Sequence, residues 1–563
     1  MDWNLGPMPR VRLRLLATLL ATSLCSTLVI VSNAQNSGID TYAITNARIV
    51  TVSGAPIERG TVVFRNGLIT AVGANVIAPA DARTIDGTGL TVYPGLIDAY
   101  TNLALPEASP VPSPGRGGGA AFLFQQQSTQ RAGGPNSTQP AGLQPETMVE
   151  EVIRTDSSDV ESARNVGFTT ALTLPRSGIW MGQSAVINLA DETPQQMIVR
   201  SPVAMHVGFT PLRGTYPGSL MGVFATLRQM MLDAQRYRDS LQIYESSPRG
   251  VRRPDTDRSL QALVPVIEGK MPVVMLANTE REISRALDLA AEFKLKLIIA
   301  GGRESARLTD RLLKQNVPVL LSLNLPRRTT AAMPEADPEP LRVLRERVEA
   351  QETAGKLAKA QVRFCFESGS LPSAGDILVN AHRTIENGLS AEDALRAFTM
   401  WPAEILGVKD QLGSIEVGKI ANLTVTRGDL FDRNSRVAHV FIDGRPVDLK
   451  PAPSAGPTSA TSRDLTGAWT VVVKLGEEKT ISLNLRQEGD RLSGSIQGPL
   501  GAGEISNASA GNQIRFTVVL NIDNQTKEAT FVGTMTGNEL SGSVTVEGHT
   551  PGTFTATKNV PGA

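Results

Sequence analysis

Few side chains in this sequence could serve as a metal ligand or as a base at neutral pH. The chain has 563 residues and only 4 histidines. His206 lies in a strand-like stretch, whereas His382 lies in a predicted helix, His439 precedes a predicted strand, and His549 is near the carboxyl end. Imidazole is the usual acid–base and metal-binding side chain. His206 could face a predicted core, and a packed, hydrogen-bonded histidine is the alternative interpretation.

Two carboxylates lie at the ends of predicted strands. Asp98 stands in the segment 90–99, and Glu367 directly follows the mostly apolar run 362–366. A carboxylate can act as a general acid or base when its environment tunes its pKa. The candidate catalytic residues are Asp98, His206 and Glu367. The candidate ligand-binding residues are Tyr100, Asn102, Arg303 and Glu367.

Several other chemistries lack their motifs. The chain has no Gly-x-Ser-x-Gly element for a serine hydrolase. The glycines at 117–119 are not followed by the Lys-Ser/Thr pair of a phosphate-binding loop. Lys+Arg and Asp+Glu both number 55, so there is no basic surplus to bind nucleic acid. Two cysteines, one of them in a predicted leader, cannot form a disulfide framework.

The amino terminus has the pattern of an export signal. Arg10, Arg12 and Arg14 precede an uncharged, mostly apolar run at 15–31, and the small residues of Ser32-Asn33-Ala34 follow. We expect residues 1–34 to be removed and the mature chain to be periplasmic or secreted, with no stable membrane span. An uncleaved membrane anchor is the alternative. Cys365 would then be the remaining thiol, and its mostly apolar neighbours predict that it is buried.

The middle of the chain alternates apolar strands with amphipathic helices. Continuous apolar strands separated by helices predict a parallel sheet that is covered on both faces. Across residues 96–404 the length favours a TIM-like βα barrel. Residues 106–145 are rich in Gly, Pro, Gln and Ser, which predicts a disordered insertion. Thr279 and Glu282 form a predicted capping box, and Ser390 a predicted helix cap.

Both flanks of this region, and the carboxyl end, have β patterns. Residues 40–95 and 405–450 predict short strands with hairpin turns at Asn66-Gly67 and Asp443-Gly444, and we expect them to form one composite β-sandwich. Residues 451–463 read as a Pro- and Ser-rich linker. Residues 464–560 alternate with period two and predict a separate all-β barrel or sandwich. The fold class is therefore α/β with a separate carboxy-terminal all-β domain.

Two separated motifs resemble the amidohydrolase superfamily, near its imidazolonepropionase-like and prolidase-like members. The first is Val92-Tyr93-Pro94-Gly95-Leu96-Ile97-Asp98-Ala99, which is similar to the family's entry into the first barrel strand. The second pairs Pro402-Ala403-Glu404-Ile405-Leu406-Gly407 with Gly413-Ser414-Ile415-Glu416-Val417-Gly418-Lys419, similar to its return to the sandwich. The resemblance spans residues 40 to 450 and implies the barrel-and-sandwich fold.

The resemblance also implies a divalent metal, usually zinc, at the barrel mouth, where it would activate water. The family's ligand positions carry no imidazole or carboxylate in this chain. They fall on Tyr100 and Asn102, Leu276, Ala300 or Gly301, and Gly369. Glu367 lies two positions before Gly369 and could partly substitute for the family's aspartate. We therefore expect no metal and no other cofactor.

Two interpretations of function remain open. The first is an exported relative of the amidohydrolases that has lost the metal site and acts as a non-catalytic protein. It would bind a small molecule or assemble with an intact relative. The second is a hydrolase of carbon–nitrogen bonds in an amide, a cyclic amide or a dipeptide. Its atypical site would be built from Glu367, Asp98, His206, Arg303 and Tyr100.

Overall fold

The computed structural model describes most of the chain between Thr41 and Asn559. The described residues are 41–106, 139–155, 157–212, 216–326, 340–369, 371, 374–432, 435–449, 465–475, 477–488, 491–499, 501–510, 514–522, 525–536, 539–546 and 552–559. The predicted leader and linker lie outside these residues. The chain divides into two compact units, residues 1–326 with 344–450, and residues 327–343 with 451–563.

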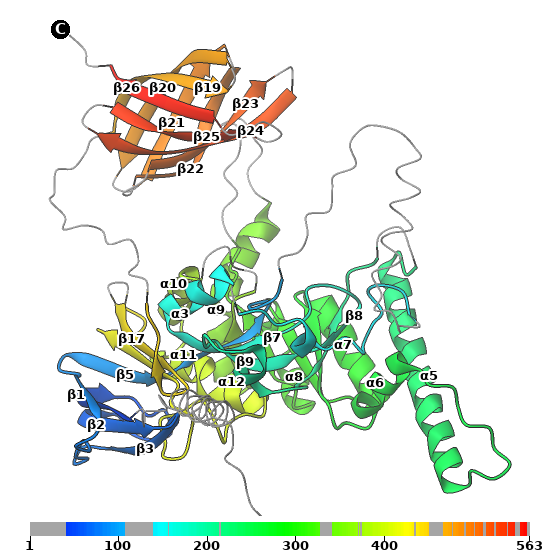
Figure 1. The fold of residues 1–563 in the computed structure, drawn as a ribbon. Coiled ribbons are helices and arrows are strands. Elements are labelled where there is room, and N and C mark those ends of the chain that lie inside the picture. Colours follow the sequence, from blue (N-terminus) through cyan, green and yellow to red (C-terminus); the bar gives the residue numbers. More distant parts are fainter. Residues whose placement is uncertain are drawn as a thin grey trace, which may run out of the picture. The chain divides into compact units, whose positions relative to one another are not determined.

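Strands from both flanks of the first unit share one eight-stranded sheet. Its order is β18-β17-β16-β5-β1-β2-β3, with β4 paired to β1. In Figure 1 the amino-terminal strands (blue) lie beside β17 (yellow), because β16 pairs antiparallel with β5. The strands are β1 (Thr41–Ile49), β2 (Ile57–Arg65), β3 (Leu68–Gly73), β4 (Arg83–Asp86), β5 (Leu90–Pro94), β16 (Leu423–Arg427), β17 (Arg436–Ile442) and β18 (Arg445–Pro446).

Strands from both flanks join one hydrogen-bonded sheet, which branches at β1, and the composite β-sandwich stays a prediction. The amino-terminal half of β1 pairs with β4, and its carboxy-terminal end pairs with β5. Between them Asn46 has a φ of 56°, in the left-handed region. Strand β1 therefore pairs with β4 and then with β5 along one side and with β2 along the other.

Both predicted hairpin turns are present in this sheet. Asn66 and Gly67 have φ values of 50° and 83° and connect β2 to β3, and Asp443 and Gly444 have φ values of 51° and 71° and connect β17 to β18. Two successive positive φ angles define the turn type that suits a twisted two-strand ribbon.

The α/β part contains two further sheets. One has the order β10-β9-β7-β6 and the other the order β15-β14-β13-β12-β11-β8, in which β11 to β15 run parallel. The strands are β6 (Leu96–Thr101), β7 (Phe168–Thr173), β8 (Trp180–Gln183), β9 (Ala185–Asn188), β10 (Ile198–Arg200), β11 (Met205–Gly208), β12 (Val273–Ala277), β13 (Leu297–Gly301), β14 (Val319–Ser322) and β15 (Phe364–Glu367).

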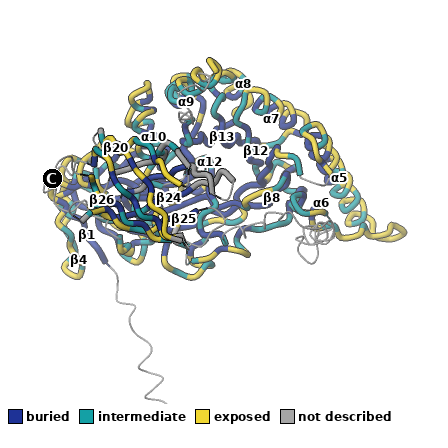
Figure 2. Tube along the Cα trace, turned by 90° about the horizontal axis from the view of Figure 1, so that it is seen from above, coloured by how far each residue is buried: buried dark blue, intermediate teal, exposed yellow. Residues whose placement is uncertain are grey.

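Helices follow the strands and cover their outer side. Figure 2 shows α7, α8 and α9 with exposed outer faces around the buried strands β12 and β13. The helices are η1 (Val149–Glu151), α3 (Ser158–Val166), α4 (Pro194–Met197), α5 (Leu220–Ser246), α6 (Arg258–Ile267), α7 (Glu280–Phe293), η2 (Ser305–Arg307), α8 (Thr309–Lys314), α9 (Leu341–Lys359), α10 (Asp376–Glu386), α11 (Ala391–Phe398) and α12 (Met400–Ile405). The predicted capping box of α7 is confirmed, because Thr279 and Glu282 exchange the expected hydrogen bonds.

Apolar residues from both sheets gather in one cluster. Each contributing strand alternates its side chains, so every second residue points to the same side. The cluster contains Ile97, Ala99, Leu172, Val186, Val274, Ile298, Ala300, Leu320 and Cys365. Cys365 is free and buried, as expected. The strands of the two sheets therefore share an interior.

Part of the predicted insertion at 106–145 is described. Leu143 is 4% exposed and forms a parallel bridge with Trp180 of β8. The backbone N–H of Gln144 donates to the carbonyl oxygen of Trp180. The carboxy-terminal end of the predicted insertion is therefore ordered, because Leu143 and Gln144 bond to the backbone of β8.

The second unit contains an all-β barrel, which confirms a separate β region at the carboxyl end. Each strand pairs antiparallel with the next, and β26 pairs with β19, so the sheet closes on itself. Trp469, Phe516 and Phe531 are fully buried in its core. The strands are β19 (Gly467–Leu475), β20 (Glu477–Glu488), β21 (Arg491–Gly498), β22 (Gly501–Ala510), β23 (Ile514–Ile522), β24 (Gln525–Thr536), β25 (Glu539–Val546) and β26 (Gly552–Lys558).

Among the residues that the structure describes, no helix is both long enough and apolar enough to span a membrane.

Candidate functional site

Asp98 and Glu367 meet where the edges of the two α/β sheets come together. Asp98 belongs to β6, the edge of one sheet, and Glu367 ends β15, the edge of the other. The backbone N–H of Ser368 donates to Asp98 Oδ1 at 3.0 Å, and the N–H of Tyr100 donates to the same oxygen at 3.4 Å. The carboxyl group of Asp98 therefore connects the two edges.

Both carboxyl groups are removed from solvent. Asp98 is 4% exposed and Glu367 is 1% exposed. Burial raises the pKa of Asp98 to about 7, against the hydrogen bonds from Ser368. Burial and then the charge of Asp98 raise the pKa of Glu367 to about 8. The charged forms are therefore disfavoured, and at neutral pH the pair holds at least part of its protons.

Gly369 and Ser322 enclose the Glu367 carboxyl group. Gly369 has a φ of 54°, and a Cβ there would overlap the Ser322 hydroxyl and lie 3.2 Å from both carboxyl oxygens of Glu367. Asn324 holds this corner, since its Nδ2 donates to the Gly369 carbonyl at 3.1 Å and its backbone N–H donates to the Ser322 hydroxyl at 3.2 Å. Only glycine fits at 369, so no side chain could point from there into the site.

His206 and Tyr100 come together from different sheets. His206, on β11, is fully buried, and its ring centroid lies 5.7 Å from that of Tyr100 on β6. Burial lowers the pKa of His206 to about 3, so the imidazole is neutral. Burial and then the charge of Glu367 raise the pKa of Tyr100, which indicates that the phenol and this carboxyl group are neighbours.

Three buried polar atoms of this group have no hydrogen-bond partner. They are Oε2 of Glu367 and both ring nitrogens of His206. A buried polar atom without a partner costs roughly 1–3 kcal/mol, so native structures seldom leave one unsatisfied. Atoms of this kind are the ones that a bound water or ligand would satisfy.

The other two candidates are held by different contacts. Asn102 donates from Nδ2 to the Leu174 carbonyl at 2.8 Å, and so fastens the end of β6 to the strand beside it. Arg303 donates to Asn278 at 3.4 Å and pairs with Glu346 of α9 at 3.6 Å. The structure thus brings together Asp98, Tyr100, His206 and Glu367.

Sequence reasoning missed Ser322 and Asn324, which position the Glu367 corner. Ser322 is the last residue of a strand, and polar residues at the carboxyl ends of neighbouring parallel strands lie at one edge of a sheet. The place of Ser322 at the end of a strand was the sequence feature that could have identified it.

Comparisons with known proteins agree with this fold. A family model described as the amidohydrolase family matches residues 325–447. An imidazolonepropionase from Symbiobacterium thermophilum is 24% identical over 419 residues, covering 69% of this chain and 91% of the relative. The crystal structure of an amidohydrolase from Thermotoga maritima MSB8 has a TM-score of 0.60 and 26% identity, covering 73% of this chain and 100% of that one. The family model, the relative and the solved structure together support the amidohydrolase superfamily for this chain.

The resemblance to this family raised the question of a divalent metal, and the donor atoms do not fit one. Within the part of the chain that the structure describes, no three His, Cys, Asp or Glu side chains are placed to hold a metal ion. Catalytic zinc sites use about three protein ligands. Asp98 already accepts two backbone hydrogen bonds at its Oδ1, which leaves this carboxyl group with fewer free lone pairs for a metal ion.

Proposed function

We propose that this protein is an amidohydrolase relative that binds a small, uncharged polar molecule without a metal ion. The proposed site lies where β6 and β15 meet. The observation that carries the proposal is the set of unpartnered buried atoms, Oε2 of Glu367 and both nitrogens of His206, next to a carboxyl pair whose charged form is disfavoured.

We propose further that the two α/β sheets form the wall of a single TIM-like barrel. The shared apolar cluster and the Ser368–Asp98 hydrogen bond support this at one junction. At the other junction the N–H of Ser184 donates to the Ala204 carbonyl at 3.0 Å. The site would then lie at the carboxyl ends of the strands, where ligands of such barrels bind.

The chemistry of the four residues selects the class of ligand. A protonated carboxyl group and a neutral imidazole each provide one donor and at least one acceptor. A charged ligand would lose its hydration without gaining a full counter-charge, which is costly. An amide or cyclic amide, which has a donor and an acceptor side by side, would fit this arrangement.

The binding test uses the full-length chain and small cyclic amides as probes, followed by isothermal titration calorimetry. We expect saturable binding that weakens about tenfold in His206→Phe, which keeps an aromatic ring beside Tyr100 but removes both nitrogens. His439→Phe, at a half-buried histidine in the first sheet, is the matched control and should bind like the unaltered protein. Equal binding by the His206 and His439 variants would refute the proposed site.

A metal-free hydrolase is the second candidate. The pKa values of about 7 and about 8 favour it, because a general acid or base works best near the ambient pH. Acid–base catalysis of this kind contributes about 10²–10⁴-fold. Turnover of a cyclic amide that survives chelation and is lost in Glu367→Gln would establish this candidate over simple binding.

We also propose that the chain is exported and that it assembles with an intact relative. The basic and apolar residues before Ala34 support export. Mass spectrometry of the native protein should find Gln35 near its amino terminus, and recovery of the intact leader would contradict this. Co-purification of a metal-binding family member from the native source would support assembly, and a chain purified alone at native expression levels would argue against it.

A further inference from the structure

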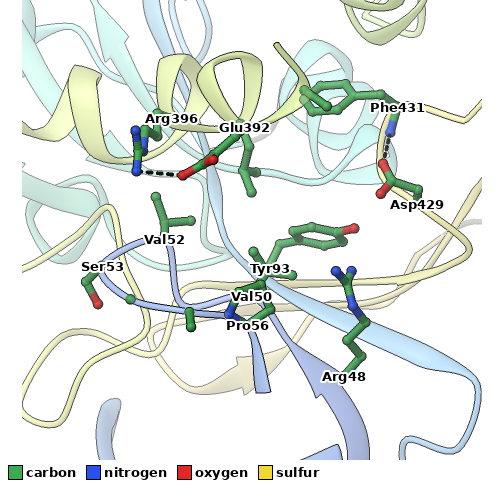
Figure 3. A pocket seen from close by; sticks show the side chains of 14 residues that line it. Arg48, Val50, Val52, Ser53, Pro56, Tyr93, Glu392, Arg396, Asp429 and Phe431 are labelled. Carbon is green, nitrogen blue, oxygen red and sulfur yellow. Dashed lines mark hydrogen bonds and ion pairs between the residues drawn. The ribbon is translucent and has the colours of Figure 1, made fainter. Parts of the chain in front are cut away.

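A separate cavity lies between the first sheet and helix α11. It has a volume of about 420 Å³, within the range of roughly 300–1,000 Å³ that small-molecule sites occupy. Its walls come from the end of β1, the following loop 50–56, Tyr93 of β5, α11 and residues 429–431 (Figure 3). These segments are distant in sequence, and all belong to the first unit.

The floor of the cavity is apolar and aromatic. Tyr93, Phe431 and Leu395 are at most 7% exposed, and Val50 and Pro56 extend the surface. An aromatic floor of this kind suits an aliphatic or aromatic group, which gains by leaving water.

Two opposite charges flank the Tyr93 hydroxyl group. Figure 3 shows Arg48 and Asp429 on the same side of the cavity as this hydroxyl. Burial and then the charge of Asp429 raise the pKa of Tyr93, whereas the Arg48 guanidinium lowers it. The Tyr93 hydroxyl also accepts a hydrogen bond from the Leu430 N–H at 3.3 Å.

Arg48 and Asp429 do not neutralise each other in an ion pair. Among the ion pairs of the described residues, none joins Arg48 to Asp429. Arg48 pairs through Nε with Glu58, which is 79% exposed, at 3.4 Å. One Asp429 oxygen accepts the Phe431 N–H at 3.2 Å. Arg48 also forms a hydrogen bond with the Tyr93 hydroxyl. Its other guanidinium N–H groups and the second carboxylate oxygen of Asp429 provide a donor and an acceptor of opposite charge beside an apolar floor.

The loop that forms one wall is strained. Val52 has a φ of 68°, which a β-branched residue rarely adopts, and it is 9% exposed. The loop is held by the Val50 N–H donating to the Val92 carbonyl and the Ile415 N–H donating to the Thr51 carbonyl. Strain of this kind persists where the surrounding structure fixes the backbone, which is common at ligand sites.

We propose that this cavity binds a zwitterionic α-amino acid with an apolar side chain, its carboxylate on Arg48, its ammonium group on Asp429 and its side chain over Tyr93 and Phe431. An amino acid is the simplest molecule that places both charges beside an apolar group. The site is distinct from the Asp98–Glu367 pair and does not depend on the function proposed there.

The test is calorimetric titration of the full-length chain with L-phenylalanine. We expect saturable binding, and binding at least about tenfold weaker for 3-phenylpropionate, phenethylamine and glycine, which each lack one of the three groups. Arg48→Met and Asp429→Asn should each weaken L-phenylalanine binding by a similar factor. The matched variants Arg59→Met and Asp448→Asn, at exposed positions, should not.

The outcomes separate this site from the carboxyl pair. Glu367→Gln should bind L-phenylalanine as the unaltered chain does, and loss of binding in that variant would overturn the proposal by moving the amino acid to the other site. Equal affinity for the analogues that lack one charge would also overturn it. Absence of saturable L-phenylalanine binding would do the same.

Discussion

At the scale of single residues, the buried carboxyl groups should make the first unit less stable as the pH rises. Burial raises the pKa of Asp98 from 3.8 to about 7, so the folded chain binds more protons than the unfolded chain between these values. This contribution is fully present below about pH 4 and is lost as the pH rises through about 7. It amounts to roughly 4 kcal/mol at most, at about 1.36 kcal/mol per pKa unit.

The variant Asp98→Asn keeps the shape and the acceptor oxygen of the protonated acid. We expect the melting temperature of the first unit to fall less in this variant than in the unaltered chain between about pH 5 and pH 8. Calorimetric scans over this range measure the difference. Asp255→Asn, at a residue that is 91% exposed, is the control. A slope that Asp98→Asn leaves unchanged would show that the carboxyl group is charged in the folded protein.

Gly369→Ala should destabilise the corner that holds Glu367. Alanine at 369 is strained by the positive φ, and its Cβ also overlaps the Ser322 hydroxyl. Gly89→Ala is the matched control, because Gly89 has a φ of 75° with open space around it. We expect unfolding by denaturant to show a larger loss for Gly369→Ala, and a partial recovery when Ser322→Ala is added. Equal losses at the two glycines would contradict the packing described.

Single residues could be predicted only in part. The sequence predicted the motif that contains Asp98 and the strand end that contains Glu367. The contact of Tyr100 with His206 could not be predicted, because the two residues lie on strands of different sheets and only the packing of these sheets brings their ring centroids to 5.7 Å. The structural contacts of Asn102 and Arg303 could not be predicted either, since their partners Leu174 and Glu346 are far away in sequence, and their role as ligand contacts stays a prediction.

At the scale of elements, the capping box at the start of α7 should contribute measurable stability. Thr279→Ala removes the side-chain acceptor for the Glu282 N–H. We expect a loss of about 1 kcal/mol in the free energy of unfolding of the first unit. Ser240→Ala, in the middle of α5, should change it little, because alanine is the better helix former at a helical position. A Thr279 variant as stable as the Ser240 variant would mean that tertiary packing alone fixes this helix.

Elements with clear periodicity or caps were the predictable ones. Helix α7, whose start was predicted from the capping box of Thr279 and Glu282, is observed at Glu280–Phe293. The strands β8 and β9 escaped prediction, since each has four residues and Gly182 interrupts the pattern. Helix α6 was also missed, with Pro265 inside it. Alternating apolar residues predicted the strands of the second unit, because both the exposed and the buried faces of an antiparallel barrel follow the same period.

At the scale of the whole molecule, the second unit should fold by itself. Its barrel closes through β19 and β26 and has its own buried core. A fragment that begins at residue 464 should show β-type circular dichroism and one cooperative melt. A fragment that remains unfolded would show that the barrel needs residues that precede position 464 in the chain.

The central claim is that the site at Asp98 and Glu367 works without a metal ion. Elemental analysis of the full-length protein, purified without chelators and compared with its protein concentration, tests this claim most directly. The account predicts Zn²⁺, Fe and Mn²⁺ at well below one equivalent, with ligand binding unchanged by added metal. About one equivalent of any of these metals, with a hydrolytic activity that chelation removes and metal restores, would contradict it.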